Sequence, residues 1–274
     1  MNILVKIISI LSLFVILSCI FRNLNSKIAP KNPTLERDGY TVANILDVET
    51  IHLIQNLWDN REFKKVNDLL LNDPGIRKFL SIKLPKEYEF MDYIMFLEKS
   101  VLHTCHRDNN ASRFNTGTSK SYTMLVYIDN MNNCLDIVPG SHKLDNIGIY
   151  SYDMTKTYKC KPGSIILFDA NMVHSGSLDS QTPNRRIQFK IAHKDDFQAL
   201  TFFDKYHKIV DKPNNNGQWS KQLQKHLSCQ FPWVADITQG QNKNYIKGDL
   251  SLMDRFFSKI LYSDPNYYRL EDVF

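Results

Sequence analysis

The chain lacks a run of basic residues and lacks any C-x-x-C pair. Its 34 Lys and Arg residues are spread along the sequence, and the net charge is only +5, so no basic stripe marks a nucleic-acid partner. The cysteines number 5, at positions 19, 105, 134, 160 and 229. Because this total is odd and no close pair occurs, the pattern argues against a disulfide framework and predicts a reducing compartment.

An apolar stretch opens the chain, over residues 1–21, and a polar segment with two prolines follows over 22–36. The stretch is long enough to span a bilayer, so we expect an N-terminal membrane anchor and a linker. A cleaved signal segment, or a lipidation site at Cys19, is the alternative. Basic residues are slightly more numerous after the stretch, which predicts a cytoplasmic catalytic domain, whereas signal cleavage would make it secreted or luminal. Use of the sequon at Asn110 would contradict the cytoplasmic side.

The rest of the composition is that of a globular protein, with 43% hydrophobic and 23% charged residues in 274. Periodicity predicts helices beginning after Asp47 and over 61–71, the second closed by a loop at 72–75. Short strands are expected within 88–106 and near 121–128, 134–138, 164–168, 171–175 and 185–193. This succession predicts a mainly β barrel or jelly roll with flanking helices. A mostly helical extension is expected over 194–274, with helices at 197–210, 218–227 and 250–261.

Metal-ligating side chains occur at His106, Asp108 and His174. In a strand, residues i and i+2 point the same way, so His106 and Asp108 can grip one ion while a second strand brings in His174. Two imidazoles and one carboxylate form the facial triad of non-haem Fe(II) oxygenases, which leaves positions open for co-substrate and O₂. A His-x-Asp tripeptide alone is weak evidence, since it arises often by chance. His103 and Cys105 alternate onto the opposite face of the strand and are interpreted as structural.

Several further segments follow His-x-Asp in a fixed order, and they carry a family resemblance. They are the apolar strand 123–129, Pro139-Gly140-Ser141-His142, Pro162-Gly163 with its apolar strand, His174, and the basic pair Arg185-Arg186. In order and spacing they resemble the phytanoyl-CoA dioxygenase-like family of Fe(II)/2-oxoglutarate-dependent oxygenases, over roughly residues 36–193. The resemblance implies a double-stranded β-helix (jelly roll, cupin-like) core, which we place at 37–193 with its N-terminal helices.

The resemblance also implies roles for individual residues. His106, Asp108 and His174 fall at the iron ligands, and Arg185 falls where the family keeps the Arg that binds the distal carboxylate of 2-oxoglutarate. Arg186 is the alternative, but Arg185 shares a strand face with apolar residues, which favours Arg185 as the inward side chain. Tyr122 or Met124 would face the co-substrate instead of the Trp or Gln often found there.

The implied activity is hydroxylation of an unactivated C–H bond, coupled to conversion of 2-oxoglutarate to succinate and CO₂ with Fe(II), O₂ and possibly ascorbate as reductant. Asp108 favours hydroxylation, because halogenases of this superfamily lack that carboxylate. Two alternatives stay open: a membrane-tethered binding or structural protein that keeps the barrel without turnover, and a cupin-type metalloenzyme that does not use 2-oxoglutarate. The substrate, small or lipid-like, and the oligomeric state are not encoded in any pattern we recognise. His142 is expected to shape a turn at the barrel mouth.

Overall fold

The structure of the protein is a computed structural model. It describes residues 32–99, 103–108, 119–143, 155–177, 184–200, 203–211 and 218–230, together with short pieces near both ends of the chain: 9–10, 12–13, 30, 232, 252, 255–256, 259–260, 265–266 and 270–274. Most of the expected N-terminal anchor and most of the linker therefore lie outside the described residues. Among the helices that can be described, none has the length and apolarity needed to cross a bilayer.

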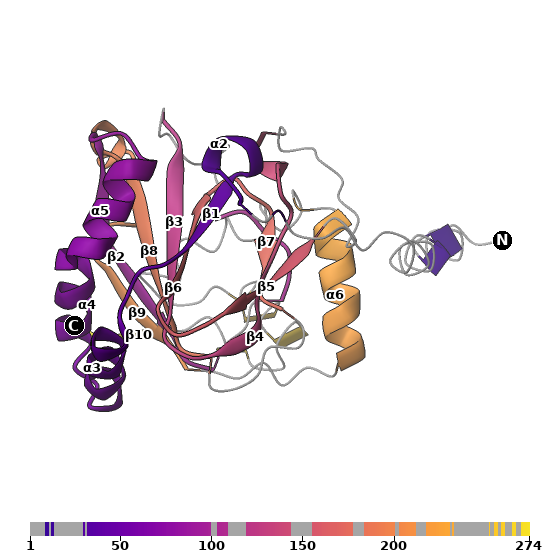
Figure 1. Ribbon diagram of the computed structural model, residues 1–274. Helices are drawn as coiled ribbons and strands as arrows, with labels where there is room; N and C mark the ends of the chain where they lie inside the picture. Colours follow the sequence, from indigo (N-terminus) through magenta and orange to yellow (C-terminus); the bar gives the residue numbers. More distant parts are fainter. Residues whose placement is uncertain are drawn as a thin grey trace.

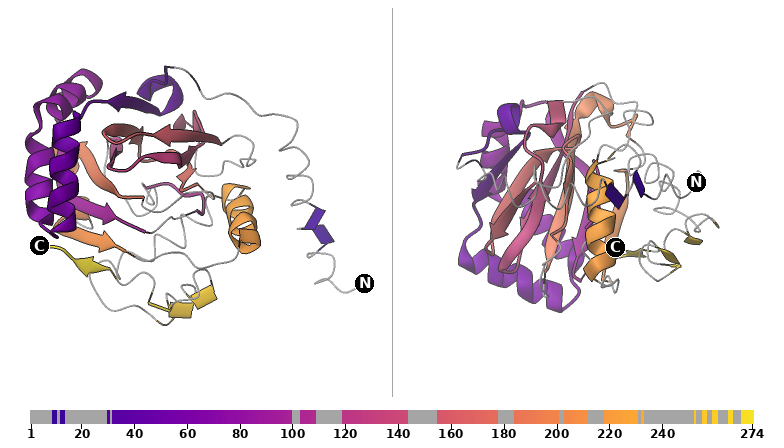
Figure 2. Two further views of the ribbon diagram at one scale, coloured as in Figure 1. Left: turned by 60° about the horizontal axis from the view of Figure 1, so that its bottom comes forward. Right: turned by 90° about the vertical axis from the view of Figure 1, so that its right-hand side faces the viewer.

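Two β-sheets face each other and form the core (Figures 1 and 2). The larger sheet has the strand order β1-β6-β3-β8-β2-β9-β10, and the smaller one has the order β5-β4-β7. The strands are β1 (Tyr40–Asn44), β2 (Tyr88–Leu97), β3 (Ser121–Tyr127), β4 (Met131–Ile137), β5 (Lys156–Cys160), β6 (Ser164–Asp169), β7 (His174–Ser175), β8 (Arg186–His193), β9 (Tyr206–Val210) and β10 (Glu271–Asp272). This is the double-stranded β-helix expected from the sequence, and most of the expected strands lie close to their predicted positions.

Three consecutive helices cover the outer face of the larger sheet: α3 (Val48–Asp59), α4 (Phe63–Asn72) and α5 (Pro74–Lys83) (Figure 1). The short helix α2 (Leu35–Asp38) precedes β1. Asp47 caps α3 by accepting a hydrogen bond from the Thr50 amide, as expected. The loop predicted at 72–75 is instead a helix junction, because the Asp73 side chain caps α5 and Pro74 occupies its first turn.

The two faces of the larger sheet have different neighbours: one packs against the helices and the other faces the smaller sheet. Ile187, Phe189 and Ile191 of β8 belong to the apolar cluster shared with the helices, as do Met124 and Val126 of β3. The intervening residues of both strands point into the space between the two sheets. In β8 the helix-covered face is therefore the apolar one, and its polar side chains lie inside the barrel, whereas β3 adds the apolar residues Leu125 and Tyr127 to the interior.

The C-terminal extension is less helical than expected. Residues 206–210 of the predicted helix 197–210 form β9, which pairs in parallel with β2 and extends the larger sheet. The helix α6 (Gln218–Gln230) is close to its predicted position and lies beside the smaller sheet (Figure 2). The helix expected at 250–261 lies largely outside the described residues.

Two disulfide bonds correct the interpretation of the cysteines. Cys105 pairs with Cys229 across 124 residues, and Cys134 pairs with Cys160 between β4 and β5. The expectation that the cysteines are unpaired was wrong because the partners are far apart in sequence. Their pairing depends on the fold, which brings α6 against the segment before His106 and sets β4 beside β5.

Candidate active site

The backbone of the smaller sheet brings His106 and His174 together. The two residues form an isolated antiparallel bridge in which each amide donates to the other carbonyl, at 2.9 and 3.0 Å. Asp108 follows His106 by two residues, and its Oδ1 lies 3.5 Å from Nε2 of each histidine. One ligand atom from each of the three residues lies within 4.8 Å of the others.

Both imidazoles are oriented with Nε2 toward this point. Nδ1 of His106 donates to the Thr104 carbonyl at 2.8 Å, and Nδ1 of His174 donates to the Met172 carbonyl at 3.0 Å. A proton on Nδ1 leaves the lone pair of Nε2 available to a metal. Adjacent ligands at about 2.1 Å from an octahedral ion lie roughly 3.0 Å apart. The observed 3.5 Å separations therefore fit an ion such as Fe(II) after a small contraction.

Electrostatics keeps His174 and Asp108 in the protonation states that a metal needs. Burial is the main effect on His174, and it lowers the pKa of this imidazole from 6.5 to about 4. Burial alone would raise the pKa of Asp108, but the neighbouring charge of Lys190 contributes to holding it well below 3.8. At neutral pH the site therefore presents a neutral imidazole at His174 and an ionised carboxylate.

The other carboxylate oxygen of Asp108 is bound by residues that the sequence analysis did not identify as part of the site. Oδ2 lies 2.8 Å from Nζ of Lys190 and accepts hydrogen bonds from Thr123 at 2.7 Å and Gln188 at 3.3 Å. Gln188 and Lys190 alternate with the apolar residues of β8, so they lie on the strand face of Arg186, which the sequence predicts to point outward. The sequence did contain a signal that these residues point inward. When a strand is buried on both sides and one face is polar, that polar face must lie where other polar groups can pair with it.

The same reversal of faces applies to the arginine pair. Arg185 binds Asp129 through its backbone amide and its guanidinium, at 2.8 to 3.2 Å, and contacts Asp59 at 2.8 Å. Its guanidinium is thus engaged by two carboxylates, and the expected inward orientation beside the triad was wrong. The apolar face of β8 looks toward the helices, and Arg186 shares the interior face with Gln188 and Lys190.

Arg186 lies among buried polar groups. Its side chain is almost fully buried, with 6% exposed, and donates to the Asn184 carbonyl at 3.2 Å. Tyr127 is its register partner on β3. Among the described residues, neither the Tyr127 hydroxyl nor the Asn184 side-chain amide has a hydrogen-bond partner, although both are buried. Burial raises the pKa of Tyr127, so its hydroxyl remains a donor. A guanidinium beside an unused hydroxyl and amide fits a buried carboxylate, the group that 2-oxoglutarate would present.

Tyr122 and Met124 do not face this space. Met124 is part of the cluster beneath the helices, and Tyr122 packs against that cluster. The alternate residues Thr123, Leu125 and Tyr127 point between the sheets instead. The expectation that Tyr122 or Met124 lines the co-substrate pocket is therefore wrong. The residues that point toward it are the neighbours of these two along β3.

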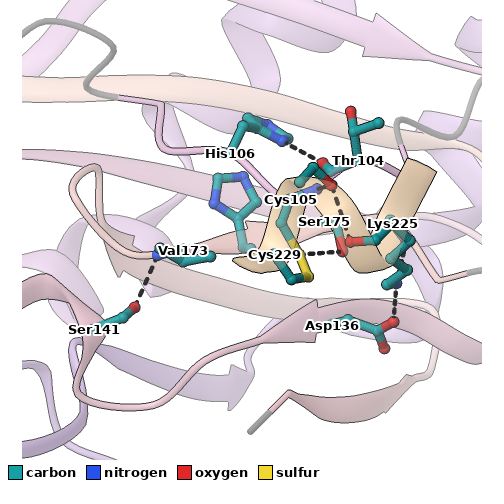
Figure 3. The surroundings of a disulfide bond; sticks show 12 residues. Thr104, Cys105, His106, Asp136, Ser141, Val173, Ser175, Lys225 and Cys229 are labelled. Atoms are coloured by element: carbon teal, nitrogen blue, oxygen red, sulfur yellow. Dashed lines mark hydrogen bonds and ion pairs between the residues drawn. A yellow bond between two sulfur atoms is a disulfide. The ribbon is translucent and has the colours of Figure 1, made fainter. Parts of the chain in front are cut away.

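The segments around the triad are held by structural contacts. Ser141 accepts a hydrogen bond from the Val173 amide at 2.8 Å, which fixes the residue before His174. Buried His142 lies against Gly39 and contacts the Glu36 carbonyl, so it packs on the turn between α2 and β1, and its expected place at the barrel mouth stays a prediction. Figure 3 shows the Cys105–Cys229 bond joining the residue before His106 to α6. His103 contacts Gln224 of the same helix, in agreement with its structural interpretation.

Comparison with protein families agrees with this arrangement. The family model described as phytanoyl-CoA dioxygenase matches residues 31–187, and the chain belongs to that family. It is therefore an Fe(II)/2-oxoglutarate-dependent oxygenase, a class that uses Fe(II), 2-oxoglutarate and O₂. The comparison with curated proteins gave no significant match.

Solved structures of similar proteins include three that are named for their chemistry or their ligands. The non-haem α-ketoglutarate-dependent epimerase SnoN from nogalamycin biosynthesis is 19% identical, with 58% of this chain and 79% of that chain covered and a TM-score of 0.45. EvdO2 from Micromonospora carbonacea var. aurantiaca, in complex with 2-oxoglutarate, is 13% identical, with 61% and 92% covered and a TM-score of 0.44. HygX from Streptomyces hygroscopicus, with nickel and 2-oxoglutarate, is 14% identical, with 58% and 83% covered and a TM-score of 0.46.

Proposed function

We propose that the protein hydroxylates an aliphatic C–H bond of a small or lipid-like substrate, with His106, Asp108 and His174 as the ligands of Fe(II). The observation that carries this proposal is the convergence of three ligand atoms. Nε2 of His106 and Nε2 of His174 each lie 3.5 Å from Oδ1 of Asp108. When bound, Fe(II) and 2-oxoglutarate would supply the electrons that activate O₂, and O₂ would be the oxidant of the C–H bond. The chain supplies fixed ligands, a neutral imidazole at His174 and a largely buried position for all three side chains.

Arg186 is the proposed partner of the distal carboxylate of 2-oxoglutarate. It is buried inside the barrel opposite Tyr127, whose hydroxyl has no partner among the described residues, whereas Arg185 lies on the helix side of the sheet with Asp59 and Asp129. An inward guanidinium also favours a 2-oxoglutarate enzyme over a cupin-type enzyme that needs no such cation. The alternative of a binding protein without turnover has no observation in its favour, because the described triad is complete.

Succinate formation tests the ligand assignment. The purified protein, with Fe(II), ascorbate and 2-oxoglutarate, is assayed across a panel of small and lipid-like substrates. We expect Asp108→Ala to abolish succinate formation, because the ion loses its only anionic protein ligand. Asp92→Ala, at an exposed carboxylate that pairs with His207, is the control and should retain wild-type activity. Equal activity in Asp108→Ala and wild type would reject the assignment.

The two arginines are compared through the apparent KM for 2-oxoglutarate. Lysine keeps the charge but loses the two-pronged geometry that a carboxylate accepts. Loss of one charge-assisted hydrogen bond costs roughly 1.5 to 3 kcal/mol, so Arg186→Lys should raise KM about 10- to 100-fold. Arg185→Lys should leave KM within about twofold of wild type. The opposite ranking would return the role to Arg185.

We infer further that the domain folds in an oxidising compartment, on the luminal or exterior side of a membrane to which the N-terminal segment tethers it. The two disulfides support this side, because such bonds persist mainly in oxidising compartments. The earlier expectation of a cytoplasmic domain depended partly on unpaired cysteines, and that support is removed. A tether also brings the site close to lipid-like substrates.

Thiol labelling of unreduced protein, followed by mass spectrometry, tests the compartment. Cys105, Cys134, Cys160 and Cys229 should stay unlabelled until a reductant is added. Glycosylation at Asn110 would support the same side of the membrane. Complete labelling of these four cysteines without reductant would restore the cytoplasmic assignment.

A further inference from the structure

We propose that Thr123, Gln188 and Lys190 act as positioning residues that hold one oxygen of Asp108, so that only the other oxygen is available to a metal. This inference rests on the proposed function, since it assumes that the triad binds a metal. The name donor cradle is used below for these three side chains.

The donor cradle divides the two oxygens of one carboxylate between different tasks. Oδ2 receives Thr123 at 2.7 Å, Lys190 at 2.8 Å and Gln188 at 3.3 Å. Oδ1 instead faces Nε2 of both histidines at 3.5 Å. The carboxylate plane is thereby fixed by contacts on the side away from the imidazoles.

Lys190 is itself held in place. Its side chain is 3% exposed, and its ammonium donates to Thr123 Oγ1 at 2.7 Å. The ammonium also lies over the rings of Tyr93 and Phe203, at 5.8 and 5.2 Å from their centroids. Thr123 and Lys190 are register partners on the neighbouring strands β3 and β8. Because the pair is built into adjacent strands, the cradle is a rigid part of the sheet.

The consequence concerns the number of positions left open on the ion. A carboxylate whose second oxygen is free can rotate and chelate an ion with both oxygens, which occupies one more position. With Oδ2 committed to three donors, Asp108 binds through Oδ1 alone. Three positions then stay open, two for a chelating co-substrate and one for O₂.

Thr123→Val is the sharpest variant, because it removes one donor to Oδ2 at nearly constant volume and without changing charge. Co(II) alone, added to the full-length metal-free protein, serves as the probe, and its visible absorption reports coordination number and geometry. Loss of an outer hydrogen bond to a metal ligand typically weakens metal binding about 10- to 100-fold. We expect that loss for Thr123→Val, together with a changed Co(II) spectrum. Thr123→Ser keeps the hydroxyl and should restore both.

Lys190→Met removes the strongest donor but also removes a positive charge that repels the ion, so its affinity has no single expected direction. The spectrum is therefore the readout for this variant, and we expect it to change. Lys208→Met is the matched control, because Lys208 is another largely buried lysine paired with an aspartate, Asp272, on the far part of the larger sheet. It should leave the Co(II) spectrum unchanged.

The outcomes separate this inference from the proposed function. Suppose that Co(II) binds wild type, that both Thr123→Val and Lys190→Met keep the wild-type spectrum, and that Thr123→Val also keeps the wild-type affinity. The proposed role of the donor cradle would then be wrong, and the metal site would still stand. This result is expected if Lys190 only balances the charge of Asp108, because Lys190→Met would then lower the free energy of unfolding and leave the Co(II) spectrum unchanged. If wild type and His174→Gln bind Co(II) equally, the metal site itself is refuted and the cradle falls with it.

Discussion

The buried imidazole of His174 makes the stability of the metal-free protein depend on pH. Its pKa is lowered from 6.5 to about 4, chiefly because burial disfavours the charged form. Between these two values the unfolded chain binds a proton at this position and the folded chain does not. Stability therefore falls as the pH is lowered from about 6.5 to about 4.

The size of the effect follows from the shift. Lowering the pKa from 6.5 to about 4 corresponds to roughly 3 kcal/mol, and most of this should be lost between pH 7.5 and pH 4. Other groups titrate in the same range, so the comparison must be made against a variant. His174→Gln removes the titrating group and keeps a polar side chain of similar reach.

The assay is urea unfolding in the presence of a chelator, repeated at several pH values for wild type and His174→Gln. The difference in unfolding free energy between the two proteins should change by about 3 kcal/mol between pH 7.5 and pH 4, with wild type losing more. A difference that stays constant over this range would show that folding does not lower the pKa of His174, which would contradict the buried imidazole described above. A change of the opposite sign would show that the folded protein keeps His174 protonated, so that the site would lack the neutral imidazole that a metal requires.

Three further variants test the packing around the site by urea unfolding. Trp58→Ala empties a fully buried position beneath the helices and should cost about 3–5 kcal/mol; a cost below about 1 kcal/mol would contradict the packing. Cys229→Ser removes the bond to Cys105 and should cost about 2–5 kcal/mol, whereas an unchanged midpoint in non-reducing buffer would show that the bond does not form. Asp136→Asn leaves the ammonium of Lys225 buried beside a neutral group and should cost about 3–5 kcal/mol (Figure 3), and a neutral outcome would place this pair in water.

The sequence predicted the triad because its signal is local. Two of the three side chains are separated by one residue, and the third follows an apolar strand within a recognisable family order. The strands of the barrel and the capped helix after Asp47 were predictable for the same reason, since periodicity and capping are read within a few residues.

The errors arose where the answer depends on which layer covers a strand. The apolar residues Ile187 and Phe189 were interpreted as facing the barrel interior, but helices far away in sequence bury that face. Because the two faces were exchanged in the prediction, three residues were placed wrongly. In the structure Arg185 lies outside the barrel, Lys190 contacts Asp108, and Met124 faces the helices. Alternation along a strand gives the two faces and does not say which of them meets the site.

The disulfides were missed for a related reason. Cys105 and Cys229 are 124 residues apart, and only the packing of α6 beside the smaller sheet brings them together. The strand β9 was mistaken for a helix because its pairing partner β2 lies more than a hundred residues earlier, and a short apolar run does not distinguish the two structures.

The most direct test of the central claim is a crystal structure of the full chain, prepared without oxygen and containing Fe(II) and 2-oxoglutarate. We expect one iron bound by Nε2 of His106, Oδ1 of Asp108 and Nε2 of His174, at about 2.0 to 2.2 Å. The distal carboxylate of 2-oxoglutarate should contact the guanidinium of Arg186. Iron bound at other side chains, or 2-oxoglutarate held by Arg185 outside the barrel, would contradict the account.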